Sequence, residues 1–160
     1  MAETVSDAGE GKVTIRVQTG DFDVSKEVIR LRASHPEIGA VVTFVGTVRD
    51  IHDGESVLSM ELEHYPGMTE QVIGEIAEAA RRRWDIVGLT VIHRIGVLKP
   101  TDQIVLVAVG TAHRSDAFRA CEFIIDLLKT QVPFWKKEET AHGSRWVTAK
   151  SSDTDALTKW

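Results

Sequence analysis

The chain has 160 residues, of which 42% are hydrophobic and 27% are charged, a composition that fits a single globular domain. The formal net charge of -5 argues against non-specific attraction to nucleic acid or to an anionic membrane. The single cysteine, Cys121, excludes an intramolecular disulfide and a zinc–thiolate cluster, and no apolar run approaches the roughly 20 residues that span a bilayer. We therefore expect a soluble protein of the cytoplasm.

The N-terminal residues predict a tail ahead of the domain. Residues 1–11 are acidic and rich in small side chains, and they lack the basic-then-apolar order of a signal peptide. We expect a flexible tail over residues 1–11 and a single domain over residues 12–160.

Hydrophobic periodicity predicts the elements that follow. Alternating or continuous apolar runs predict strands at residues 13–17, 41–48, 58–62, 89–95, 104–109 and 145–150. Apolar spacings of three and four predict helices at residues 24–31, 68–84 and 115–131, with Asp23 and Ser115 capping the first and the last. The core stripe expected for the last helix is Phe118, Cys121, Ile125 and Leu128. This mixed order predicts an α+β fold with a mixed or antiparallel sheet.

Two of these strands carry further expectations. The apolar run at residues 41–48 is typical of a central strand. Asp53-Gly54 is a turn signal, so this run and the strand at residues 58–62 are expected to pair as a long hairpin.

A basic segment lies inside this acidic chain. Residues 113–137 hold five Lys or Arg and three Asp or Glu, a local charge of +2, whereas the remaining chain holds 14 against 21, a charge of -7. His113 and Arg114 lie between a buried strand and a helix start, where free backbone N–H groups favour an anion. Arg49 follows a strand, and Lys129 is near the end of a helix. These positions suggest an anion-binding site.

The alternative is that these cations have no functional role. Lys129 would stabilise the helix dipole by about 0.3–1 kcal/mol, and residues 136–139 would form a solvated charged turn. The six histidines lack the spacing of a zinc site, so no metal centre is expected. Cys121 is expected to be an inert core thiol.

Several motifs together resemble one family. GAVVTFVGTVRD, LEHYPGMTE, HRIGVL, AHRSDAF and LKTQVPFWKKE followed by RWV resemble the large, catalytic subunit of molybdopterin synthase. The resemblance runs from about residue 13 to residue 160. It implies an α/β-hammerhead fold joined to an additional antiparallel β subdomain.

The resemblance also implies a reaction and its partners. The family is a sulfurtransferase of molybdenum cofactor biosynthesis, which moves sulfur from the C-terminal Gly-Gly thiocarboxylate of a small ubiquitin-like subunit to cyclic pyranopterin monophosphate. The product is the dithiolene of molybdopterin. Large subunits form a homodimer within a heterotetramer, and the enzyme needs no cofactor or metal of its own.

Matched position by position, the resemblance implies two catalytic lysines, Lys129 and Lys136. The remaining positions that it assigns to substrate binding are Thr47, Val48, Arg49, His113, Arg114, Lys137 and Glu138. Some relatives carry a lysine where Thr47 stands. Arg145 is a candidate for a residue that reaches across the dimer interface.

These residue types suit the implied chemistry. A phosphate and a thiocarboxylate must meet in one pocket, and clustered cations offset their repulsion. Neighbouring cations would disfavour the ammonium form of Lys129 and so suit it to general acid/base catalysis, while Lys136 stabilises developing negative charge.

Two other functions are consistent with the same residues. Lys129 could form a Schiff base with a carbonyl substrate, which borohydride would trap. A non-catalytic adaptor could use the basic segment only to hold the tail of a ubiquitin-like protein, and it would bind that partner without turning over a pterin.

Overall fold

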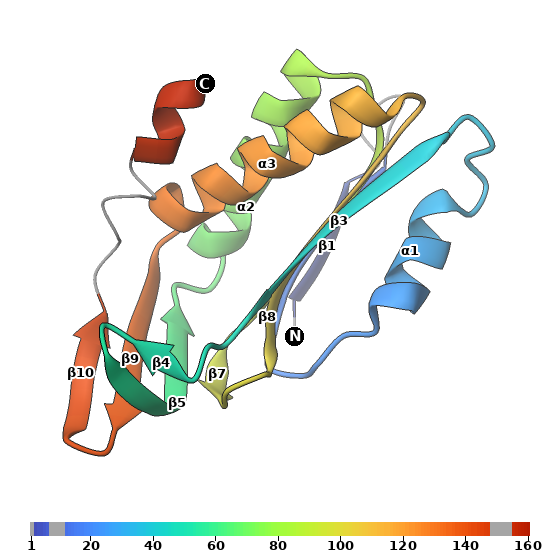
Figure 1. Cartoon of the computed structure of the whole chain (residues 1–160). Coiled ribbons are helices and arrows are strands. Elements are labelled where there is room, and N and C mark those ends of the chain that lie inside the picture. Colours follow the sequence, from blue (N-terminus) through green and yellow to red (C-terminus); the bar gives the residue numbers. More distant parts are fainter. Residues whose placement is uncertain (1, 7–11, 148–154) are drawn as a thin grey trace.

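The computed structural model describes residues 2–6, 12–147 and 155–160, which form two β-sheets and three α-helices (Figure 1). The first sheet contains, in spatial order, β1 (Ala2–Ser6), β2 (Lys12–Gln18), β6 (Ile86–Arg94), β8 (Gln103–Thr111) and β3 (Ala40–Thr47). Strands β2 and β6 are parallel, and the other neighbours are antiparallel. The predicted α+β class is confirmed.

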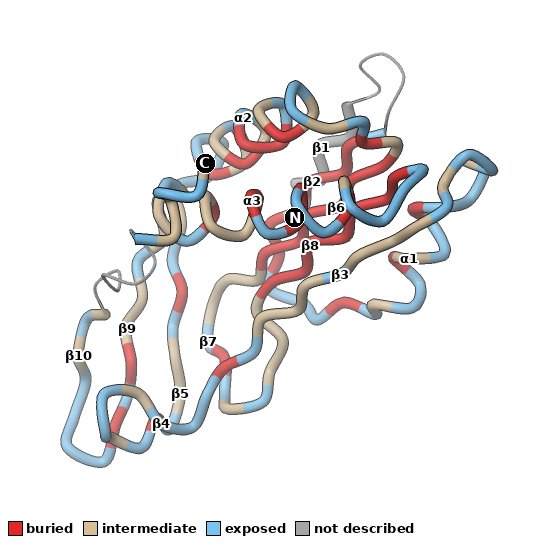
Figure 2. The backbone as a smooth tube through the Cα atoms, turned by 45° about the horizontal axis from the view of Figure 1, so that its top comes forward, coloured by how far each residue is buried: buried red, intermediate tan, exposed pale blue. Residues whose placement is uncertain are grey.

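Helices cover both faces of this sheet. Helix α1 (Val24–Arg32) packs on one face, and α2 (Met68–Arg83) and α3 (Arg114–Gln131) pack on the other. Strands β6 and β8 are therefore buried on both faces, which explains their continuous apolar sequences (Figure 2). The described residues include no helix that is long and apolar enough to cross a bilayer.

The second sheet lies beyond the C-terminal end of α3 (Figure 1). Its order is β10 (Gly143–Val147), β9 (Phe134–Thr140), β5 (Glu55–His64) and β4 (Ile51–His52), and β7 (Gly96–Leu98) also pairs with β5. A small core of Val48, Leu62 and Leu98 joins this sheet to the strands of the first.

The chain then returns to the helical layer. A 3-10 turn (Leu157–Lys159) precedes Trp160, whose ring packs edge-on against Trp84 and Phe123. The Trp160 indole N–H donates to Asp126 at 2.8 Å, so the C-terminal residues are bound to α3.

The predicted helices and most predicted strands are confirmed, because their signals are local; residues 148–150 of the strand predicted at residues 145–150 lie outside the described residues. Asp23 caps α1 by accepting a hydrogen bond from the Lys26 N–H at 3.1 Å. Asp53 and Gly54 both have positive φ angles and form the two-residue turn between β4 and β5.

The predicted long hairpin is wrong. β3 pairs with β8 at the edge of the first sheet, whereas β5 belongs to the second sheet and pairs with β9, β7 and the short β4. β3 is therefore not a central strand. A local turn signal specifies a turn but not how far the strands beside it continue, and here the chain changes sheets between Thr47 and Ile51.

Four further expectations are corrected. Residues 136–139 lie in strand β9, not in a solvated turn, and residues 2–6 of the predicted tail form β1; residues 1 and 7–11 of that tail lie outside the described residues. Helix α3 begins at Arg114 with His113 as its N-cap, two residues before the predicted Ser115 cap. Phe118 is 62% exposed, because the buried face of α3 runs through Ala117, Cys121, Ile124 and Leu128 and Phe118 lies beside that face.

Candidate functional site

A pocket of about 550 Å³ lies where the two sheets meet the C-terminal end of α3, which is a size typical of small-molecule sites. Its lining comes from β3, β4, β5, β6, β8, α3, β9 and β10 and from the segments that join them. The polar and charged side chains in that lining are Thr47, Arg49, His52, His93, Lys129, Thr130, Lys136 and Glu138.

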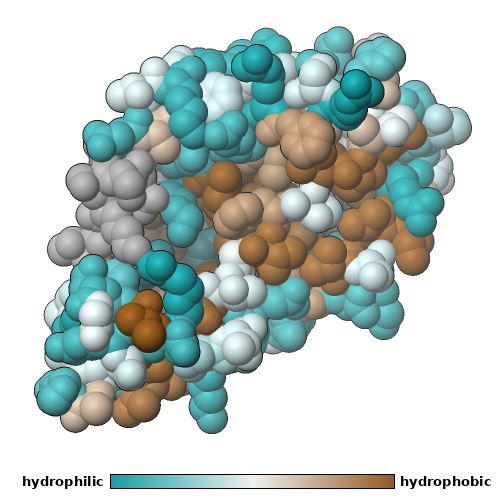
Figure 3. All heavy atoms as spheres, viewed as in Figure 1, coloured by the Kyte–Doolittle hydropathy of each residue, from teal (hydrophilic) through white to brown (hydrophobic). Residues whose placement is uncertain are grey.

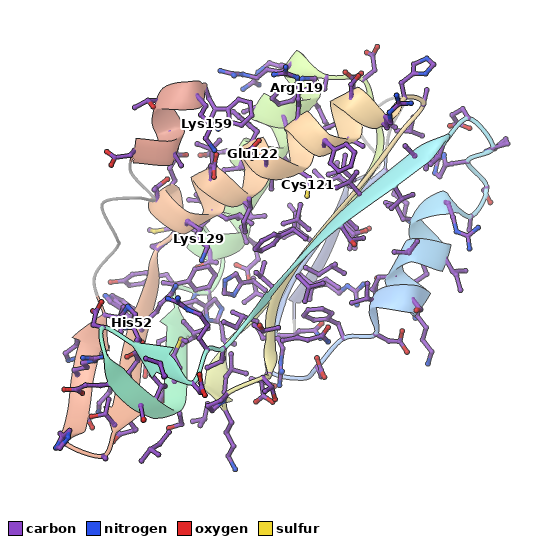
Figure 4. The ribbon with its side chains drawn as sticks, viewed as in Figure 1. His52, Arg119, Cys121, Glu122, Lys129 and Lys159 are labelled. Carbon is purple, nitrogen blue, oxygen red and sulfur yellow. The ribbon has the colours of Figure 1, made fainter. Side chains whose placement is uncertain are left out.

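Three of the predicted cations line this one pocket. Arg49 follows β3 in a turn held by two backbone hydrogen bonds, in which the Val48 N–H donates to the Asp102 carbonyl and the Thr101 N–H donates to the Val48 carbonyl. Lys129 projects from the last turn of α3, and Lys136 lies on β9 just beyond Pro133. Figure 4 shows Lys129 at the end of α3 and His52 at β4, on either side of the space that these elements enclose.

The alternation of β9 explains how its polar residues reach the pocket. Phe134, Lys136 and Glu138 line the pocket, whereas Trp135 and Lys137 face the other side of the strand. The Lys137 ammonium lies 5.9 Å from the centroid of the exposed Trp146 ring. The structure therefore brings Lys136 and Glu138 to the pocket and separates Lys137 from it.

Other predicted site residues also lie outside the pocket lining. Val48 is only 3% exposed and packs with Leu62 and Leu98, and its backbone N–H and C=O are both bonded. His113 and Arg114 are exposed at the opposite end of α3, about 22 Å from Lys129 along the helix at roughly 1.5 Å per residue. Within one chain, these two residues and Lys129 cannot contact the same small molecule.

Glu138 is a buried carboxylate with two basic neighbours. Arg145 donates to Glu138 Oε2 from both Nε and Nη2, each at 3.2 Å. His52 Nδ1 lies 2.9 Å from Glu138 Oε1, close enough for an ion pair although not aligned as a hydrogen bond. Arg145, a candidate for crossing to another subunit, is thus engaged within its own chain.

His93 is a pocket residue that sequence reasoning did not identify as functional. Its Nδ1 donates to the Arg94 carbonyl oxygen at 2.8 Å, because a carbonyl can only accept, and its ring stacks on Phe134. Burial, together with the positive charges of Lys136 and Lys129, lowers the pKa of His93 to about 3. His93 is therefore a neutral imidazole beside two cations.

His52 was also missed, since a histidine in a two-residue strand gives no periodic signal. For His93, the signal available was its place in the inward-facing stripe of Leu89, Val91 and His93, where a polar side chain interrupts a buried strand. A buried polar group in such a stripe indicates either a satisfied core residue or a site.

The charged lining of the pocket can bind anions and move protons, but it supplies no thiol. Its described lining includes neither cysteine nor serine. Cys121 is 4% exposed on α3, where burial raises the pKa of its thiol to about 12. A sulfur nucleophile for chemistry in this pocket would have to come from another molecule. No group of three or more His, Cys, Asp or Glu side chains suited to a metal ion occurs in the described residues.

Comparison with known proteins identifies close relatives. The model of the MoaE protein family matches residues 17–131. The chain is 60% identical over 147 residues to the molybdopterin synthase catalytic subunit of Ralstonia nicotianae, covering 92% of this chain and 84% of that protein.

Solved structures agree with this similarity. The molybdopterin biosynthesis MoaE protein of Burkholderia ambifaria superposes with a TM-score of 0.79 at 55% identity, covering 91% of this chain and 96% of that one. Molybdopterin synthase from Staphylococcus aureus superposes with a TM-score of 0.77 at 33% identity, covering 82% and 95%.

Proposed function

We infer the role of the pocket from the premise that this chain belongs to the MoaE protein family. The chain is a catalytic subunit of molybdopterin synthase, a sulfurtransferase of molybdenum cofactor biosynthesis. We propose that the pocket receives cyclic pyranopterin monophosphate and the C-terminal thiocarboxylate of a small ubiquitin-like subunit. The carrying observation is that Arg49, Lys129 and Lys136, from three separate segments, line one pocket.

The proposed mechanism assigns a role to each cation. Arg49 binds the substrate phosphate, for which the guanidinium fork is suited. The thiocarboxylate sulfur of the partner attacks a carbon of the substrate, and a carbon–oxygen bond at that carbon breaks as the carbon–sulfur bond forms. Lys129 as general acid gives the departing oxygen its proton, and the partner's acyl group stays attached to the new sulfur as a thioester. Lys136 stabilises the negative charge that develops on the acyl oxygen, and Lys129 transfers protons as general acid and base. Water then releases the partner as a carboxylate and leaves the sulfur on the pterin.

Proposals about assembly follow from the same premise. The small subunit would insert its C-terminal tail into the pocket, and large subunits would pair as a homodimer within a heterotetramer. His113 and Arg114 would then join a pocket only from a second copy of the chain. The α/β-hammerhead description of the fold and the cytoplasmic location remain predictions.

Single-turnover sulfur transfer tests the assignment of Lys129. With a thiocarboxylated small subunit and cyclic pyranopterin monophosphate, Lys129→Ala is expected to slow formation of the two-sulfur product by about 100-fold or more. Lys26→Ala removes an exposed lysine on α1 and is the matched control with wild-type rate. A folded Lys129→Ala protein that transfers sulfur at the wild-type rate would contradict the assignment.

The same preparation distinguishes the two alternatives. A Schiff-base enzyme would give a covalent adduct at Lys129 after borohydride treatment, and the proposed mechanism predicts none. An adaptor would bind the small subunit and leave the pterin unchanged, so mass spectrometry of the pterin separates it from the synthase.

A further inference from the structure

We propose that Arg145 is a positioning residue that keeps the pocket cationic by neutralising Glu138. This inference rests on the proposed function, because it concerns affinity for the anionic substrate. Arg145 is not part of the pocket lining, so it would act through Glu138 and His52 and not by touching the substrate.

The need for such a residue comes from the position of Glu138. Its carboxylate is 4% exposed and lines the same pocket as Lys129 and Lys136, where a negative charge would repel a phosphate. A buried carboxylate also requires hydrogen-bonding or charged partners, because burying it without them is costly. An uncompensated Glu138 would thus cancel much of the attraction that the lysines provide.

The geometry of Arg145 meets that need. Arg145 lies directly opposite Glu138 in the β9–β10 ladder, and two of its nitrogens donate to the same carboxylate oxygen. Its Nη2 also donates to the His52 carbonyl oxygen at 2.6 Å, and its Nη1 lies 3.6 Å from Glu55 Oε2. One guanidinium therefore connects β10 and β9 to the β4–β5 hairpin.

The same contacts set the place of His52. Its backbone is held by Arg145, and its ring contacts the other oxygen of Glu138, so the two basic residues bracket the carboxylate from two directions. The planar fork is required for this arrangement, because a lysine offers one point of charge and cannot reach the carboxylate and the carbonyl in the same way.

The test compares anion binding by four proteins. Inorganic phosphate is titrated calorimetrically into the wild type, Arg145→Met, Glu138→Gln and the double variant, at low ionic strength. Arg145→Met is expected to weaken phosphate binding by about tenfold or more, and the double variant is expected to return to within about threefold of wild type. Arg119→Met removes an exposed arginine from the outer side of α3 and is the control for net charge (Figure 4).

Two results would overturn the inference. One is an unchanged phosphate affinity in folded Arg145→Met, and the other is a double variant that binds phosphate as weakly as Arg145→Met. If Arg145→Met does not fold, Glu138→Gln alone decides: the inference predicts tighter phosphate binding than wild type, and weaker binding would overturn it.

Steady-state sulfur transfer supplies a second readout. Arg145→Met is expected to raise KM for cyclic pyranopterin monophosphate more than it lowers kcat, whereas a purely structural role would lower the active fraction and leave KM unchanged. If the wild type transfers no sulfur, the proposed function fails, but the phosphate titrations still test the role of Arg145. Failure of the proposed function is therefore distinguishable from failure of the inference about Arg145.

Discussion

The ring of His93 stacks on the ring of Phe134, with centroids 3.9 Å apart and planes inclined by 20°. His93 belongs to β6 of the first sheet and Phe134 to β9 of the second, so this contact joins the two sheets at the pocket. Because the Nδ1–H of His93 is bonded to a carbonyl, the unprotonated Nε2 remains as an acceptor.

Acid is expected to destabilise the protein through His93. Its folded-state pKa of about 3 lies below the ordinary value of 6.5, because the ring is buried and lies near Lys136, Lys129 and His64. Between these pH values the unfolded chain binds a proton that the native chain does not. The contribution of neutral His93 to the free energy of unfolding is therefore complete above pH 6.5. It is lost as the pH falls toward 3, and the free energy of unfolding then falls by up to about 1.4 kcal/mol per pH unit.

Urea unfolding from pH 7 to pH 4 measures this effect. His93→Phe keeps an aromatic ring against Phe134 and removes the titrating group, so its free energy of unfolding is expected to fall less steeply over this range. Carboxylates titrate in both proteins and cancel in the difference. Equal slopes for the two proteins would contradict the assignment of His93.

Cys121 is expected to resist alkylation in the native protein. Burial raises the pKa of the thiol to about 12, and its Sγ lies 3.8 Å from the Val107 carbonyl oxygen inside the core. At pH 8, iodoacetamide should modify it at least about 100-fold more slowly than in urea, since the thiolate is the reactive form. Rapid stoichiometric labelling of the folded protein, followed by mass spectrometry, would be inconsistent with this packing.

Gly39 is expected to tolerate no larger side chain. A Cβ at this position would overlap the carbonyl oxygen of Ala112, and the Gly39 N–H donates to the Thr111 carbonyl at 2.9 Å, so the backbone cannot move freely. Gly39→Ala should lower the free energy of unfolding by about 1–3 kcal/mol. Gly20→Ala is the control, because a Cβ there meets nothing within 4 Å. Equal urea midpoints for the two variants would contradict the prediction, because they would show that the backbone before β3 shifts to accommodate the added Cβ.

Sequence reasoning succeeded where signals are local. The periodicities of the helices, the Asp23 cap and the Asp53-Gly54 turn each depend on neighbouring residues only, and the structure contains all of them. The pairing of β3 with β8 instead joins residues about 60 positions apart, and no local pattern specifies such a partner. That is why the predicted hairpin was wrong although its turn was right.

The site was predictable only in part for a related reason. β9 was overlooked because its inward-facing residues include Lys136 and Glu138, which line a pocket and so break the apolar alternation expected of a strand. The motifs singled out Arg49, Lys129 and Lys136, which line one pocket in the structure. The pairing of Glu138 with Arg145 and His52 depends on the second sheet, whose assembly the sequence pattern did not reveal.

The pocket has a consequence for biosynthesis of the chain itself. Its lining runs from Gly46 to Val147, so a nascent chain that ends before β9 contains Arg49 and Lys129 but neither Lys136 nor Glu138. Ribosome-bound intermediates therefore have no complete anion site until residue 147 has emerged and the strands have paired.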